Sequence, residues 1–179
     1  MRLQQLAWKQ LETMCKTLIF HGITSVNQDD WCDISIMCCG NNQSPIPLGK
    51  EEMKKSLIPM PAFNFLNHDI SPKSVTMLND GHTLMIQFEY TLQLELTSGG
   101  LLDRYTFSNL HFHWGSNDFQ GSEHTIKNNR APLEMHLVYF SSKFTNLTSA
   151  RASMKSDAIA VLAVLFHIDD NNINPSLEK

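Results

Sequence analysis

Two stretches near the middle of the chain have the residue types of β-strands, the first alternating polar and apolar side chains and the second largely apolar, so that side chains two residues apart face the same side. They comprise residues 109–114 and residues 133–140. Within the first stretch, His111 and His113 point to the same side of the strand. His136 has an equivalent place in the second stretch. If the two strands pair antiparallel, the three imidazole groups converge on one point.

Three neutral imidazole nitrogens around one ion leave a fourth tetrahedral position for water, which is the arrangement of a catalytic zinc site. The competing interpretation is that these histidines bind no metal, because single histidines are usually core or surface residues and H-x-H pairs occur by chance. A metal-bound imidazole normally donates its other N–H to a carboxylate or carbonyl group. Glu134 lies on the strand face required to accept this bond from His136 and so favours the metal site. Asn109 is placed to orient His111 in the same way.

Further strands are predicted on both sides of this pair. Residues 84–96 alternate over a length too great for one typical strand, so we expect a bent or broken one. Residues 159–168 are almost continuously apolar, which indicates a strand buried on both faces. Asn79-Asp80-Gly81 predicts a turn. Residues 148–155 are expected to form a helical turn. The composition of residues 31–66 predicts loops with short extended pieces.

The first 30 residues follow a helical pattern instead. Apolar residues recur at helical spacing with polar residues between them, which predicts an amphipathic helix packed on the domain. The segment is a poor signal peptide, since its apolar run at residues 18–20 is short and no small-residue cleavage site follows.

Composition narrows the function classes. A chain of 179 residues can form one domain with a sizeable core. The net charge of -4 and the lack of a basic stripe argue against a nucleic-acid partner, and no apolar run is long enough to span a bilayer. All four cysteines precede residue 40 without a CxxC pair, so a cysteine zinc site is not expected. Their disulfide state, the compartment (secreted or cytoplasmic) and the oligomeric state stay open.

Several motifs occur in the order found in a known family. His111-Phe112-His113-Trp114-Gly115-Ser116, Gln120-Gly121-Ser122-Glu123-His124-Thr125 and Leu133-Glu134-Met135-His136-Leu137-Val138 resemble the α-class carbonic anhydrases. Gln43-Ser44-Pro45-Ile46, Asn79-Asp80-Gly81-His82 and Asp157-Ala158-Ile159-Ala160-Val161 resemble further blocks of that family. The resemblance covers residues 31–179, which it implies are a partial domain of that family, and residues 1–30 are an N-terminal segment that diverges from it. It implies an α+β, mostly β fold: a large central mixed, largely antiparallel twisted sheet with few short helices. Because the family continues past residue 179, we expect the sheet to be incomplete at its C-terminal end.

The resemblance also implies an activity, the zinc-dependent reversible hydration of CO2 to bicarbonate by a zinc-bound hydroxide. Zinc would be held by His111, His113 and His136, and the implied partner is the small-molecule substrate, CO2 or bicarbonate. His82 matches the histidine that shuttles protons to solvent, a role suited to a pKa near 6.5. Without the resemblance it would be a surface loop histidine.

Three more positions are carried over from the family. Glu123 matches an acid that accepts a hydrogen bond from a threonine, which in the family lies beyond residue 179. Val138 and Val161 match positions that form an apolar wall for CO2, although both are equally well explained as ordinary core valines.

The alternative function is a catalytically weak or silent relative, either a truncated isoform or a binding module, that still binds zinc. The intact histidine triad favours the enzyme, and the absent C-terminal segment favours the alternative. We also expect residues 159–168 to lack a strand partner on one side. Such an exposed apolar edge favours aggregation, and it predicts lower stability and activity than in a full-length relative.

Overall fold

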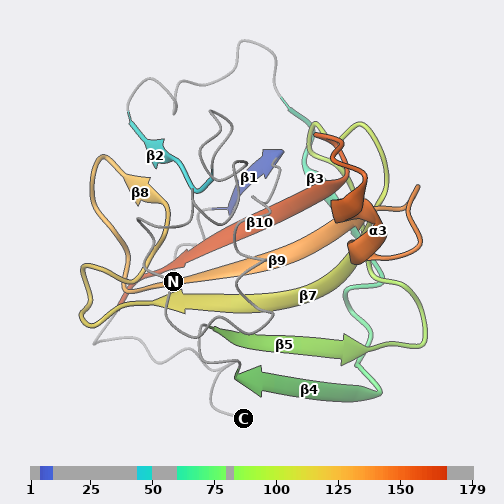
Figure 1. Cartoon of the computed structure of the whole chain (residues 1–179), viewed down its shortest axis with the longest axis horizontal. Helices are drawn as coiled ribbons and strands as arrows, with labels where there is room; N and C mark the ends of the chain where they lie inside the picture. The colour runs from blue at the N-terminus through green and yellow to red at the C-terminus, as the bar shows by residue number, and fades with distance from the viewer. Residues whose placement is uncertain (1–4, 10–43, 50–59, 80–82, 169–179) are drawn as a thin grey trace.

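The computed structural model describes residues 5–9, 44–49, 60–79 and 83–168. Its centre is an eight-stranded twisted sheet in the order β1-β10-β9-β7-β5-β4, with β6 pairing both β7 and β3 beside this path (Figure 1). A second sheet contains only β2 and β8. The elements are β1 (Gln5–Lys9), β2 (Pro47–Leu48), β3 (Phe63–Leu66), β4 (Ser74–Asn79), β5 (Leu84–Glu89), β6 (Glu95–Ser98), β7 (Tyr105–Trp114), β8 (Thr125–Ile126), β9 (Leu133–Ser141), α3 (Leu147–Ala152) and β10 (Ile159–Phe166).

The predicted fold class is confirmed. All strand pairings in the large sheet are antiparallel, and the described parallel pairing joins β2 to β8. The stretch at residues 84–96 is broken into β5 and β6, as expected, and the helical turn after residue 147 is α3. Asn146 begins α3 as its N-cap, because its side chain accepts a hydrogen bond from the backbone N–H of Ser149. No helix in the described ranges is long and apolar enough to cross a membrane.

The register of β7 and β9 decides which side chains meet. His111 lies opposite His136, and His113 lies opposite Glu134. The register shifts between Phe107 and Asn109, so β7 carries a bulge there. A bulge inserts one unpaired residue into a strand and resets which side chains share a face. Beyond the bulge, the odd-numbered residues of β7 face the same side of the sheet as the even-numbered residues of β9.

The β7–β9 pair therefore has two different faces. The histidine face carries His111, His113, Glu134, His136 and Val138, and the opposite face carries Leu110, Phe112, Met135 and Leu137. Each face is continued by a hydrophobic cluster. The cluster on the histidine face lies beside α3 and contains Val138, Ala150, Ala158, Ile159 and Val161. The cluster on the opposite face contains Leu96, Tyr105, Tyr139, Ala160 and Leu162.

The predicted N-terminal helix is wrong at Gln5–Lys9, which form the strand β1. This strand pairs antiparallel with β10, from Gln5 opposite Val164 to Lys9 opposite Ala160. The physical reason is that β10 is buried almost throughout, so its backbone N–H and C=O groups need partners that water cannot supply. Strand pairing satisfies them, and this tertiary contact outweighs the local helical pattern. The remainder of the predicted helix lies outside the described residues.

The same pairing overturns the expected unpaired edge of residues 159–168. β10 has β9 on one side from Ile159 to Phe166 and β1 on the other side from Ala160 to Val164. β10 is therefore an interior strand of the sheet, between β1 and β9 (Figure 1). The opposite end of this strand order is β4, all six residues of which are exposed.

Candidate metal centre

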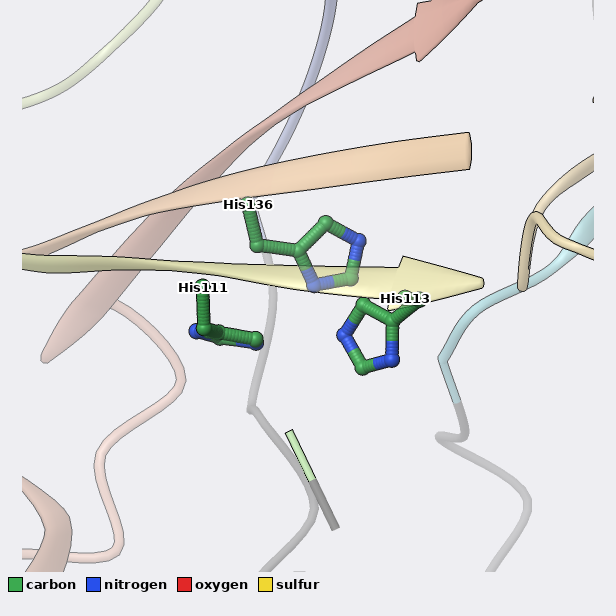
Figure 2. A group of neighbouring side chains, drawn as sticks. All are labelled: His111, His113 and His136. Atoms are coloured by element: carbon green, nitrogen blue, oxygen red, sulfur yellow. The ribbon is translucent and has the colours of Figure 1, made fainter. Parts of the chain in front are cut away.

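Three imidazole rings meet on the histidine face. β7 supplies His111 and His113, two residues apart, and β9 supplies His136 (Figure 2). The ring centroids are 5.0 Å apart for His111 and His113, 5.2 Å for His111 and His136, and 4.6 Å for His113 and His136. One nitrogen from each ring lies within 4.8 Å of the others. The antiparallel pairing thus brings together the three histidines that the sequence pattern selected.

Glu134 is fully buried behind these rings and accepts four hydrogen bonds. Its Oε1 atom accepts from His124 Nδ1 and from His136 Nε2, both at 2.5 Å. Its Oε2 atom accepts from the backbone N–H groups of Glu123 and His124, both at 2.9 Å. A carboxylate offers about four lone-pair sites, so these donors satisfy it. Burial alone raises the pKa of Glu134, but the hydrogen bonds from His124 and His136 outweigh it and hold the pKa far below the usual range.

The ionised Glu134 fixes the tautomer of His136. Since Nε2–H donates to the carboxylate, the proton is on Nε2, and Nδ1 keeps its lone pair for a ligand. This is the partner that metal-bound histidines normally have. Three imidazoles on one strand face, one of them supported in this way, form the donor set of a catalytic zinc site. The residues present therefore fit a zinc ion.

Glu123 lies beside two of the histidines. Its Oε2 atom is 3.3 Å from His113 Nε2 and 3.9 Å from His136 Nδ1. The backbone N–H of the same residue donates to Glu134. The loop between β7 and β9 therefore places a second carboxylate at the edge of the three-histidine cluster.

His124 is a residue of this site to which the sequence pattern assigned no role. It is 4% exposed, and both its ring and its backbone N–H donate to Glu134. His124, Glu134 and His136 form a second group whose ligand atoms lie within 4.8 Å of one another. In this group Glu134 Oε1 already accepts from both rings, so we interpret it as a hydrogen-bond network that supports the first group. The available signal was the position of His124 directly after Glu123 in the Gln120–Thr125 motif.

The other predicted positions have different outcomes. Asn109 is buried on the histidine face, where its side-chain amide donates to Ser108 Oγ at 3.1 Å. Its predicted role in orienting His111 stays a prediction. Val138 and Val161 lie opposite each other on β9 and β10 and are buried in one cluster. His82 lies outside the described residues.

Fold and site together define a class of protein. An antiparallel sheet that presents three converging imidazoles, one of them held by a buried carboxylate, has the architecture of a zinc-enzyme centre. The sequence profile of the eukaryotic-type carbonic anhydrases matches residues 26–179. The chain belongs to this family.

Individual relatives agree with the profile. The chain is 36% identical to carbonic anhydrase 1 of Oryctolagus cuniculus over 141 residues, which are 78% of this chain and 57% of the relative. It is 34% identical to carbonic anhydrase 6 of Mus musculus over 155 residues, which are 84% of this chain and 46% of the relative. It is 33% identical to carbonic anhydrase 15 of Mus musculus over 146 residues, which are 79% of this chain and 44% of the relative. The chain thus spans about half the length of the curated relatives it matches.

Proposed function

We propose that this chain binds one zinc ion and catalyses the reversible hydration of CO2 to bicarbonate. The observation that carries the proposal is the convergence of His111, His113 and His136 beside the buried, ionised Glu134. Membership of the carbonic anhydrase family supports the choice of CO2 among the substrates that a zinc centre can activate.

Each residue of the histidine face has a distinct part in this proposal. His111, His113 and His136 hold the ion through neutral nitrogens, and bound zinc would lower the pKa of water to about 7, so that hydroxide is available at neutral pH. Carbonic anhydrase is itself the standard example of that value. Glu134 keeps His136 in the ligating tautomer. Glu123, next to two ligand rings, is placed to accept a hydrogen bond from a donor at the reacting oxygen.

CO2 has no dipole moment and accepts hydrogen bonds only weakly, so it needs an apolar surface next to the metal. Val138 lies two residues after His136 on the same face. Val161 lies directly beside Val138 on the neighbouring strand β10. We assign them to the wall of the substrate site. Their burial in the cluster beside α3 also suits an ordinary core role, so the assignment rests on their place beside His136.

Turnover releases a proton that has to reach solvent. We assign this transfer to His82, on the resemblance alone. The expected signature is that His82→Ala is slower than the parent in weak buffer and recovers in concentrated imidazole buffer, where buffer replaces the side chain. An equal rate in weak buffer would remove His82 from the mechanism.

The test of the proposal is CO2 hydration by the purified, zinc-loaded chain, followed by stopped-flow indicator kinetics and paired with its zinc content. His136→Ala serves as the matched inactive variant. We expect hydration above the buffer rate in the parent and not in the variant. A parent that holds zinc without hydrating CO2 would instead identify a silent, zinc-binding relative.

A further inference from the structure

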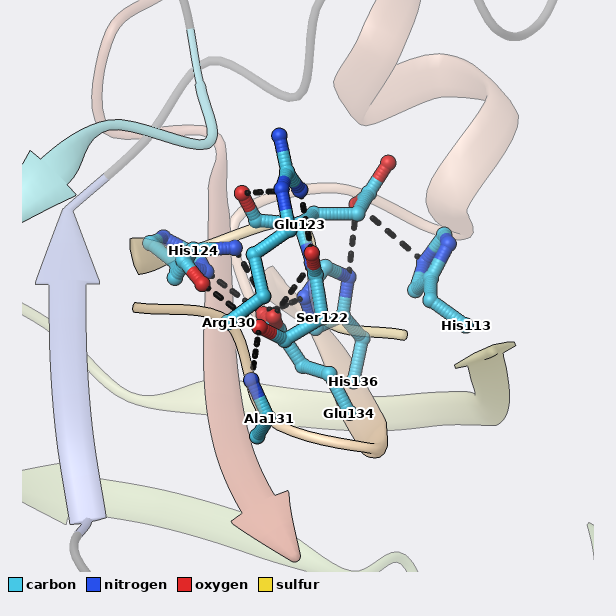
Figure 3. A network of polar contacts seen from close by, with 8 residues as sticks. All are labelled: His113, Ser122, Glu123, His124, Arg130, Ala131, Glu134 and His136. Carbon is cyan, nitrogen blue, oxygen red and sulfur yellow. Dashed lines mark hydrogen bonds and ion pairs between the residues drawn. The ribbon is translucent and has the colours of Figure 1, made fainter. Parts of the chain in front are cut away.

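Two consecutive peptide groups in the loop before β9 are held at both ends by opposite charges. The first joins Ser122 to Glu123: its C=O accepts from Arg130 Nη1, and its N–H donates to Glu134 Oε2 at 2.9 Å. The second joins Glu123 to His124: its C=O accepts from Arg130 Nη1 at 3.3 Å, and its N–H donates to Glu134 Oε2 at 2.9 Å. Figure 3 shows this arrangement, with the guanidinium group on one side of the loop and the Glu134 carboxylate on the other.

We propose that Arg130 is a positioning residue of the metal centre, acting on Glu134 and Glu123 through these two peptide groups. The inference rests on the proposed zinc site and adds to it a residue that lies six positions beyond His124 and contacts none of the three zinc-ligand histidines. Arg130 supplies the positive charge that faces Glu134 across the loop backbone.

The electrostatic argument follows from the direction of the peptide dipoles. Each peptide group carries a dipole of about 3.5 D with its positive end at the N–H. Here both positive ends point at the carboxylate and both negative ends point at the guanidinium. Hydrogen bonds in such a chain polarise and strengthen one another. Arg130 therefore strengthens two of the four bonds that keep the buried Glu134 satisfied.

Arg130 reaches this position because the loop is a tightly closed hairpin. The buried Ser122 joins its two sides: Ser122 Oγ accepts from Ala131 N at 2.8 Å and donates to His124 O at 2.7 Å, and Ser122 N donates to Ala131 O at 2.7 Å. Gly121 allows this approach, since a Cβ atom there would lie 1.7 Å from Pro132 O. The hairpin thus returns residue 130 to the carbonyl groups of residues 122 and 123.

The consequence for the metal centre runs through two side chains. Glu134 holds His136, so weaker support of its carboxylate loosens one zinc ligand. The same two peptide groups flank Glu123, whose carboxylate lies 3.3 Å from His113 Nε2, so their orientation sets where that carboxylate points. Loss of the guanidinium group should therefore affect metal retention even though the three zinc ligands are unchanged.

The first test measures the rate at which the full chain loses zinc to an excess of chelator. Replacing outer partners of metal ligands commonly costs about 10–100-fold in affinity, so we expect about tenfold faster loss for Arg130→Met. Arg130→Lys keeps the charge and should restore most of the parent rate. Lys127→Met removes a positive charge from the same hairpin without touching either carbonyl, and it should match the parent. Parent-like zinc loss in Arg130→Met, or equal loss in the Met and Lys variants, would overturn the proposal.

The second test needs no metal. In the zinc-free chain, hydrogen exchange of the backbone amides of Glu123 and His124 should be faster in Arg130→Met, while the amide of Tyr139 in the other cluster keeps its parent rate. Faster exchange at all three sites would indicate general destabilisation and contradict a positioning role. A parent chain that binds no zinc would sink the proposed function, but this exchange measurement would still decide whether Arg130 supports Glu134.

Discussion

Around the three-histidine cluster, the two faces of the β7–β9 strand pair are built from opposite kinds of side chain, and two polar residues are more buried than the apolar residues behind them. On the histidine face, Glu134 is fully buried and His136 is 6% exposed, while His111 and His113 are partly exposed. On the opposite face, Leu110, Phe112, Met135 and Leu137 are partly exposed, whereas Tyr105 and Tyr139, farther along the same face, are fully buried. Trp114, at the end of the same face, is 55% exposed.

The difference shows that hydrogen bonding, more than hydropathy, controls the burial of this part of the sheet. Burying a carboxylate is costly unless the charge is paired and hydrogen-bonded. Glu134 has four donors, and the loop that brings two of them also covers the histidine face. Among the described residues, no comparable network covers Leu110, Phe112 and Met135, and the contacts of Phe63 and His68 on the opposite face lie farther along, at Tyr139. The following predictions test this contrast.

Removing the charge of Glu134 should have the largest effect. Glu134→Gln keeps the shape of the side chain but turns one acceptor oxygen into a donor, so two of the four donors lose their partner. Each unsatisfied buried group costs about 1–3 kcal/mol, so we expect the zinc-free chain to lose about 2–5 kcal/mol of unfolding free energy. Urea denaturation measures this loss.

Glu95→Gln is the matched control for that measurement. Glu95 also forms an ion pair, with Arg104 at 2.8 Å, but the arginine side chain is 56% exposed. Ion pairs of that kind contribute about 0–1 kcal/mol. If the two glutamine variants unfolded at the same urea concentration, the buried Glu134 carboxylate would contribute no more to stability than the exposed ion pair of Glu95, contrary to this prediction.

Alanine substitutions at two nearby residues of β9 should lower the free energy of unfolding, and the smaller side chain should cause the larger loss. Val138 is fully buried on the histidine face, so Val138→Ala should cost about 2 kcal/mol. Met135 is larger but partly exposed on the opposite face, so Met135→Ala should cost about 1 kcal/mol or less. The same denaturation assay compares them. A greater loss for Met135→Ala would mean that the opposite face is covered in solution.

A pH effect should be smaller and should come from the opposite face. There, the hydrogen-bond partners of His68 among the described residues are neutral: Leu66 O at 2.9 Å and the Tyr139 hydroxyl at 3.0 Å. Burial lowers the pKa of His68, although its bond to Leu66 opposes the shift. The unfolded chain therefore takes up this proton at a higher pH than the folded chain, and stability falls as pH drops through and below about 6.5.

His68→Gln removes this titration. Between pH 7 and pH 5 the variant should lose less unfolding free energy than the parent, whatever the difference in stability between them at pH 7. Thermal unfolding across that range provides the comparison. If parent and variant kept a constant difference at every pH, His68 would not contribute to the acid sensitivity.

Much of this arrangement could be predicted because it depends on strand periodicity. The period of two placed His111 and His113 on one face, and antiparallel pairing with β9 then brought His136 to them. The buried strand at residues 159–168 and the break within residues 84–96 follow from local composition in the same way.

The remainder depends on contacts that no local pattern encodes. β1 is a strand because β10 needs a backbone partner, whereas its own sequence has helical spacing. His124 and Arg130 join the site through a hairpin closed by Ser122, and their parts depend on which backbone groups that hairpin brings within reach. The exposure of the opposite face is likewise a property of the packed chain.

The zinc content of the metal-loaded, dialysed chain tests most directly whether the histidine face is a metal centre. We predict about one zinc per parent chain and a loss of tightly held zinc in His136→Ala. His167→Ala, which removes an exposed histidine just after β10, should keep the parent value. If His136→Ala retained as much zinc as the parent, His111, His113 and His136 would not be the metal site.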